Sequence, residues 1–154
     1  MAWADGLRRA HFPPERNQVR AHVTLFHALP PWLEGEARAL LADLAAAPPP
    51  PATIARVLDL GGGTALGIEC PAMLDVRDEI AERFHGLLTA QDSHAARLHV
   101  TIQNKVDRPA ARALQAELAT GFRPRSFRFH GLGLHVYEGG PWRTLRTFAF
   151  RGRG

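Results

Sequence analysis

One tripeptide, His-Val-Thr, occurs twice in this chain, at residues 22–24 and again at residues 99–101. Each copy is followed by an aliphatic residue and is preceded two positions earlier by an arginine. Both copies lie in short, alternating, β-branched runs, which predict strands over residues 19–26 and 97–104. Side chains two apart on a strand share a face, so each copy should project its histidine and threonine together and its valine toward the core.

The similarity continues beyond the tripeptides. Residues 37–44 read ARALLADL and residues 111–118 read ARALQAEL, and both segments have a helical pattern of leucines among strong helix formers. Asp107 and Pro109 mark the start of the second helix. The chain therefore carries an internal duplication of a strand–helix unit, which predicts an α+β fold.

The remaining segments complete this α+β pattern. Helices are predicted over 2–11, 34–47, 73–89 and 109–120, and further strands over 53–60, 64–70, 125–138 and 142–150. The apolar side of the third helix is expected at Leu74, Ile80, Phe84, Leu87 and Leu88. The glycines at 61–63 are followed by neither a lysine nor a helix start, which favours a hairpin turn over a phosphate-binding loop. No linker separates independent domains, so we expect one domain over residues 1–154.

Composition limits the class of protein. The chain has 154 residues, 45% of them apolar and 22% charged, and no apolar run approaches the length of a membrane span. The N-terminus carries no hydrophobic signal segment, and the single cysteine, Cys70, excludes an internal disulfide. These features predict a cytoplasmic protein with no membrane partner.

The formal net charge of +4 is unevenly distributed. From Gly121 onward seven arginines face a single acidic residue, Glu138. Such a cluster favours a polyanionic partner, since arginine bonds phosphate oxygens in pairs. A coding bias toward arginine explains the same pattern equally simply, because Lys105 is the only lysine.

The paired His-x-Thr motifs, 77 positions apart, and the duplicated strand–helix order resemble the 2H phosphoesterase superfamily, and within it the bacterial 2′-5′ RNA ligase family. The run Leu98-His-Val-Thr-Ile-Gln-Asn-Lys-Val106 is similar to that family's second motif. The resemblance implies two pseudo-symmetric lobes, here roughly residues 1–70 and 71–154, whose antiparallel sheets form a central cleft. It also implies hydrolysis of 2′,3′-cyclic phosphates or 2′-5′ phosphodiesters, in some members the reverse ligation, and no metal or other cofactor.

The same resemblance assigns the catalytic residues by position: His22, Thr24, His99 and Thr101. It favours His99 as the base and His22 as the acid. One departure from the family pattern is that a strand normally precedes the first helix, whereas this chain begins almost directly with its helix at Met1-Ala2-Trp3. We therefore expect one of two explanations: the recorded start lies downstream of that strand, or this chain lacks a strand that the sheet normally contains.

The chemistry also follows from the residue types. Imidazole, with an ordinary pKa of about 6.5, serves as acid or base near neutral pH, and threonine hydroxyls can donate to phosphate oxygens. If both rings serve one phosphate, their nitrogens should lie roughly 4–8 Å apart. We expect a monomer acting on RNA or nucleotides with a cyclic or 2′-5′ phosphate.

Further residues are candidates for substrate contact, each with a structural alternative: Phe26, Gln103, Lys105 and Tyr137. Gln103 and Lys105 continue the face of His99 and Thr101 along the strand. Phe26 and Tyr137 could stack on a base or simply pack. Three alternatives to catalysis stay open: a non-catalytic RNA-binding module, a metal site formed by His22, His94 and His99, and duplicated histidines with a structural role.

Overall fold

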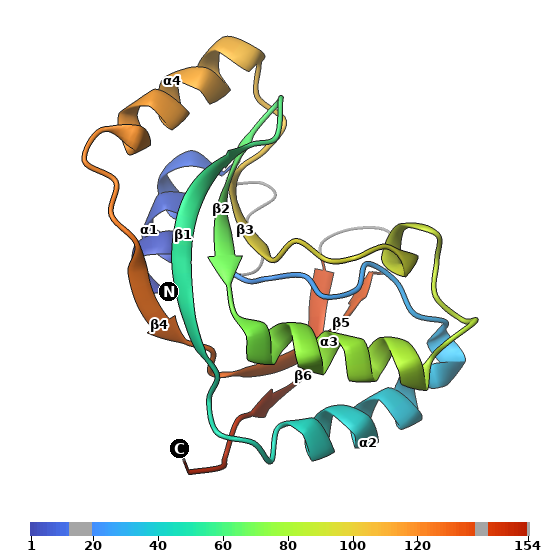
Figure 1. Ribbon diagram of the computed structural model, residues 1–154. Helices are drawn as coiled ribbons and strands as arrows, with labels where there is room; N and C mark the ends of the chain where they lie inside the picture. The colour runs from blue at the N-terminus through green and yellow to red at the C-terminus, as the bar shows by residue number, and fades with distance from the viewer. Residues whose placement is uncertain (13–19, 138–141, 154) are drawn as a thin grey trace. The chain divides into compact units, whose positions relative to one another are not determined.

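A computed structural model describes residues 1–12, 20–137 and 142–153 of the chain. The described chain divides into two compact units, each made from segments that are distant in the sequence. The first unit comprises Met1–Thr24, Thr53–Glu69 and Arg97–Phe127, and the second comprises Leu25–Ala52, Cys70–Ala96 and Arg128–Gly154. Figure 1 follows the chain from its blue N-terminus to its red C-terminus.

The first unit is built on an antiparallel sheet with the strand order β3-β2-β1-β4 (Figure 1). Its elements are α1 (Ala2–His11), β1 (Pro51–Asp59), β2 (Thr64–Glu69), β3 (His99–Gln103), α4 (Arg108–Ala119) and β4 (Arg125–Arg128). Leu66, Val100 and Ile102 are fully buried in its core. Helix α4 begins where the sequence predicts, because the Asp107 side chain accepts a hydrogen bond from the backbone N–H of Ala110 at 2.8 Å.

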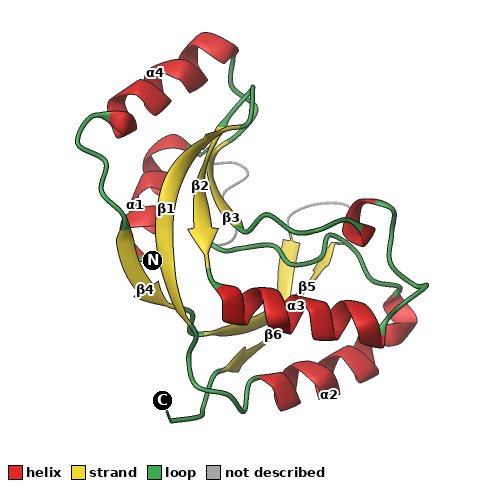
Figure 2. Cartoon of the chain, in the orientation of Figure 1, coloured by secondary structure: helices red, strands yellow, loops and turns green. Residues whose placement is uncertain are grey.

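The second unit combines helices with the β5-β6 hairpin. Its elements are η2 (Pro31–Leu33), α2 (Glu34–Leu44), α3 (Pro71–Arg83), η3 (Gln91–Ser93), β5 (Gly131–Tyr137) and β6 (Trp142–Ala149), drawn by type in Figure 2. Leu33, Cys70 and Phe84 are the largest apolar side chains buried completely there. Residues 138–141, between β5 and β6, lie outside the described residues.

The α+β class with antiparallel sheets is confirmed, but the units do not coincide with the sequence halves 1–70 and 71–154. The physical reason is strand pairing: β2, from the first half, pairs with β3, from the second. The predicted strand over 125–138 is also divided. Its first part, β4, joins the sheet of the first unit, and its second part, β5, pairs with β6.

Helix α3 differs from the prediction in its buried face. Met73, Arg77 and Ile80 are the buried residues of the helix, whereas Leu74 is 38% exposed. The helix also ends at Arg83, before Phe84, rather than near residue 89. Residues 73, 77, 80 and 84 follow helical spacing, so an arginine occupies the middle of an otherwise apolar stripe.

The turn between β1 and β2 requires glycine at position 63, where a Cβ atom would collide with the backbone carbonyl oxygen of Gln103. We expect Gly63→Ala to lower the free energy of unfolding by about 1–3 kcal/mol, because backbone atoms must shift to relieve the overlap. Urea unfolding measures this. Gly35→Ala is the matched control: nothing lies within 4 Å of a Cβ there, and Gly35 lies in helix α2. The control should be neutral or stabilising by up to about 1 kcal/mol, so equal destabilisation of both variants would contradict the prediction.

Within the described ranges, no helix has both the length and the apolar character that crossing a membrane requires.

Candidate functional site

The first motif, His22 to Thr24, lies in a loop segment and not in a strand. The predicted strand over 19–26 is wrong for its described part, since residues 20–30 contain no strand (Figure 2). Side chains replace the strand partners: the backbone N–H of Ala21 donates to Oδ1 of Asp5 at 3.0 Å. A backbone group satisfied in this way needs no neighbouring strand. His22 and Thr24 are both exposed.

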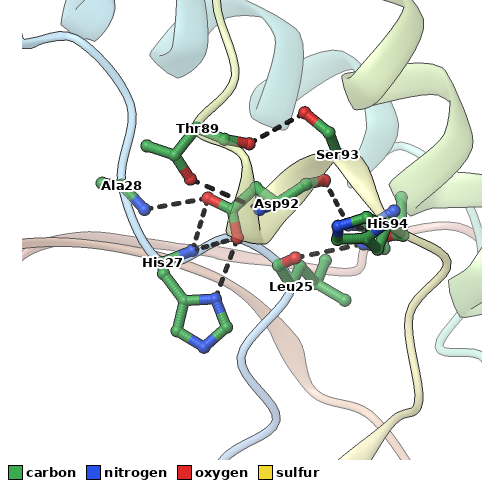
Figure 3. A network of polar contacts seen from close by, with 8 residues as sticks. Leu25, His27, Ala28, Thr89, Asp92, Ser93 and His94 are labelled. Carbon is green, nitrogen blue, oxygen red and sulfur yellow. Dashed lines mark hydrogen bonds and ion pairs between the residues drawn. The ribbon is translucent and has the colours of Figure 1, made fainter.

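The segment that follows Thr24 belongs to the second unit and is held there by Asp92 (Figure 3). The Asp92 carboxylate accepts bonds from the backbone N–H groups of His27 and Ala28, and it bonds the His27 ring through Nδ1 at 2.8 Å. Burial alone would raise the pKa of Asp92, but the hydrogen bonds from His27 and Ala28 have the larger combined effect and hold the pKa below the ordinary 3.8.

Arg77 of helix α3 fixes the same segment from a second direction. Its Nε donates to the carbonyl oxygen of Leu25 at 3.2 Å, and its Nη2 donates to the carbonyl oxygens of Asp92 and His94. The guanidinium also lies 4.7 Å from the centre of the Phe26 ring. Phe26, a predicted substrate contact, is therefore placed against Arg77 in the second unit.

The second motif lies in strand β3, as predicted. His99 pairs with Gly67 of β2, and Thr101 pairs with Ala65, so both side chains lie on one face of the sheet and both are half-buried. Val100 and Ile102 are fully buried.

The two histidines share one local geometry. Nδ1 of His22 lies 2.7 Å from the carbonyl oxygen of Arg20, and Nδ1 of His99 lies 2.8 Å from the carbonyl oxygen of Arg97. A carbonyl oxygen can only accept, so Nδ1 must carry the hydrogen in both rings. In the neutral ring the lone pair is then on Nε2, which is the nitrogen that takes up a proton.

Helix α1 is the element to which both motifs are bound. Asp5 bonds the backbone next to His22, and three residues later Nη1 of Arg8 donates to the carbonyl oxygen of Thr101 at 2.7 Å. Residues three apart lie on the same face of a helix, so one face of α1 holds both motifs.

Arg8 and Asp5 were missed by sequence reasoning. Burial lowers the pKa of Arg8, and the Asp5 carboxylate partly offsets that shift. The guanidinium lies 3.8 Å from the centre of the Phe12 ring. The available signal was spacing, because Ala4, Arg8 and Phe12 are four residues apart and all three are buried.

A cavity of about 330 Å³ lies beside His99 in the first unit. Its lining combines apolar residues with charged ones: Val57, Leu58, Asp59, Leu60 and Arg97. Leu60 is 45% exposed. The mixed lining is suited to a ligand with both apolar and ionic parts.

Gln103 is not on the face of His99. The β2–β3 register shifts between Thr64 and Ala65, and the extra residue in β3 turns Gln103 to the opposite face of the sheet. There Gln103 is buried, and its Oε1 accepts a hydrogen bond from the Thr64 hydroxyl at 3.0 Å. The same hydroxyl accepts a hydrogen bond from Nε2 of Gln115 in α4. These contacts give Gln103 a structural role under α4.

The other two predicted substrate-binding residues are Lys105 and Tyr137. Lys105 follows β3 at a φ of 54° and is exposed. Tyr137 ends β5, and its side chain lies outside the described part of the structure. Among the residues that the structure describes, no three His, Cys, Asp or Glu side chains are grouped to hold a metal ion.

Comparison with known proteins places these features in a family. A search of curated proteins found no match. Among solved structures, the chain is similar to the crystal structure of TT0787 from Thermus thermophilus, with a TM-score of 0.63 and 16% identity over 99% of this chain and 94% of that one. At this identity the likeness concerns the fold. The family model of the 2′-5′ RNA ligase superfamily matches residues 1–141. The chain therefore belongs to the 2′-5′ RNA ligase superfamily, as the resemblance carried by its paired His-x-Thr motifs indicates.

Proposed function

We propose that this protein is a metal-independent phosphoesterase that hydrolyses 2′,3′-cyclic phosphates or 2′-5′ phosphodiesters of nucleotides or RNA ends. The observation that carries the proposal is the matched geometry of His22 and His99, each with Nδ1 bound to the carbonyl two residues earlier. Two rings in one tautomer give a pair of Nε2 atoms for proton transfer.

The proposed mechanism uses the two rings in opposite protonation states. One Nε2, unprotonated, takes the proton of the attacking water as the water oxygen bonds to phosphorus. The other, protonated, gives its proton to the ribose oxygen as the bond from phosphorus to that oxygen breaks. We assign the base to His99 and the acid to His22, as the family resemblance implies.

Thr24 and Thr101 complete the proposed site. Their hydroxyls donate to the non-bridging phosphate oxygens, where negative charge accumulates in the transition state. If a ribose 5′-hydroxyl attacks a 2′,3′-cyclic phosphate in place of water, the base takes the hydroxyl proton and the acid protonates the 3′ oxygen as its bond to phosphorus breaks, which forms a 2′-5′ linkage. The bonds that fix α1 to both motifs support this assignment, since catalytic groups must be held in place before the substrate arrives.

The decisive experiment is turnover of 2′,3′-cyclic nucleotide monophosphates by the purified protein in the presence of EDTA. We expect hydrolysis to a nucleoside monophosphate at a rate that the chelator does not change. Loss of turnover in EDTA, with recovery on adding zinc or manganese, would contradict the proposed mechanism. Binding of the nucleotide without turnover would instead identify a non-catalytic RNA-binding module.

A further inference from the structure

Glycine at position 67 is unusual, because it lies buried in the interior of strand β2. Glycine within a strand costs roughly 0.5–1 kcal/mol relative to alanine and often marks a close approach by another group. Here that group is Arg56. A Cβ atom at position 67 would lie 2.8 Å from Cγ, 3.5 Å from Cδ and 3.5 Å from Nη1 of Arg56. The absence of a side chain therefore lets Arg56 lie flat across strand β2.

The strand register directs Arg56 toward the proposed catalytic residue. Arg56 of β1 pairs with Gly67 of β2, and Gly67 pairs with His99 of β3, so the three residues form one row on one face of the sheet. Neighbouring strands are about 4.8 Å apart. Since Nη1 already lies over the middle strand, the guanidinium is about one strand spacing from β3.

Glu69 holds one end of the guanidinium and leaves other donors available. Nη2 of Arg56 donates to Oε1 of Glu69 at 2.6 Å, and the two side chains are 51% and 59% exposed. An exposed pair of this kind contributes at most about 1 kcal/mol to stability, and it does not require a glycine beneath it. A guanidinium has five N–H donors, so Nη1 and Nε can bind a second anion while Nη2 stays on Glu69.

We propose that Arg56 is a substrate-binding residue that donates to the phosphate on which His99 acts. This inference rests on the proposed function, and it identifies the recognised group as the phosphate of a cyclic or 2′-5′ diester and of the monophosphate product. The planar fork of arginine bonds two phosphate oxygens at once, and the bonds strengthen as charge accumulates on those oxygens. A phosphate between the guanidinium and the His99 ring would contact both.

The test is calorimetric titration with adenosine 2′-monophosphate and 3′-monophosphate, using Arg56→Ala and three comparison variants. We expect the Kd of Arg56→Ala to rise at least about 10-fold, and Arg56→Lys to recover part of the loss through its charge. Arg83→Ala is the matched control, since Arg83, at the end of helix α3, forms an ion pair of similar exposure at 2.7 Å with Glu36 of helix α2. Its Kd should be unchanged. Glu69→Gln removes the same ion pair but keeps the cation, so it should bind as tightly as the wild type or more tightly.

The comparison variants separate phosphate binding from a structural role of the ion pair. Equal weakening in Arg56→Ala and Glu69→Gln would overturn the inference, as would unchanged affinity in Arg56→Ala or no binding by the wild type. Where turnover is measurable, the pH profile of Arg56→Ala should keep its shape while kcat/KM falls, since arginine transfers no proton. If the wild type binds the monophosphates but hydrolyses nothing, the proposed function fails while the titration still decides the role of Arg56.

Discussion

Replacing either His22 or His99 by alanine is expected to lower kcat/KM for a 2′,3′-cyclic nucleotide at least about 100-fold, in line with the contribution of general acid–base catalysis. Each ring is assigned one proton transfer, and alanine removes the nitrogen that carries that proton. The wild type should follow a bell-shaped pH profile, with one limb for each imidazole. Steady-state rates between about pH 5 and 9 measure both effects.

The controls for the histidine variants come from the same chain. His85→Ala, which removes an exposed histidine after helix α3, should retain full activity. Thr24→Ala and Thr101→Ala should be affected less than either histidine variant, since each removes one hydroxyl donor among several. Activity of His22→Ala or His99→Ala within a few-fold of the wild type, with the fold intact by circular dichroism, would exclude the two-histidine mechanism.

The second motif could be predicted more completely than the first. Around His99 the alternation of side chains matches a strand because β2 is present to pair with it. Around His22 the same alternation occurs, but the backbone bonds to Asp5 and Asp92 instead of a neighbouring strand. Local alternation predicts which side chains share a face. The groups that hydrogen-bond to the backbone depend on residues that are distant in the sequence, so alternation does not predict them.

The residues that position the site were harder to predict because they break the usual rules of burial. Arg8 and Arg77 are charged and buried, and a prediction of buried positions from the spacing of apolar residues does not include them. Arg56 reaches the row of His99 only through the register of three strands, which depends on non-local pairing. Gln103 is turned away from that row by one extra residue, a local irregularity that hydrophobic alternation does not reveal.

Asp92→Ala is expected to lower the free energy of unfolding by about 2–4 kcal/mol, because it removes a buried carboxylate together with the hydrogen bonds that the carboxylate accepts. The lost bonds are those from the backbone N–H groups of His27 and Ala28 and from the His27 ring. Urea unfolding at pH 6 measures the loss. Asp78→Ala, at an exposed position on helix α3, is the control and should stay within about 0.5 kcal/mol of the wild type.

The pH dependence of the same comparison gives a second, independent test. The pKa of Asp92 is lowered in the folded protein, so its contribution to stability is fully present above the unfolded value near 3.8 and is lost as the pH falls through the lower, folded value. The difference in unfolding free energy between the wild type and Asp92→Ala should therefore be constant between about pH 5 and 6 and should narrow below about pH 4. The variant loses the titrating group, so its own stability should fall less steeply with acid over that range. A difference that stays constant down to about pH 2 would mean that the carboxylate charge does not hold this segment.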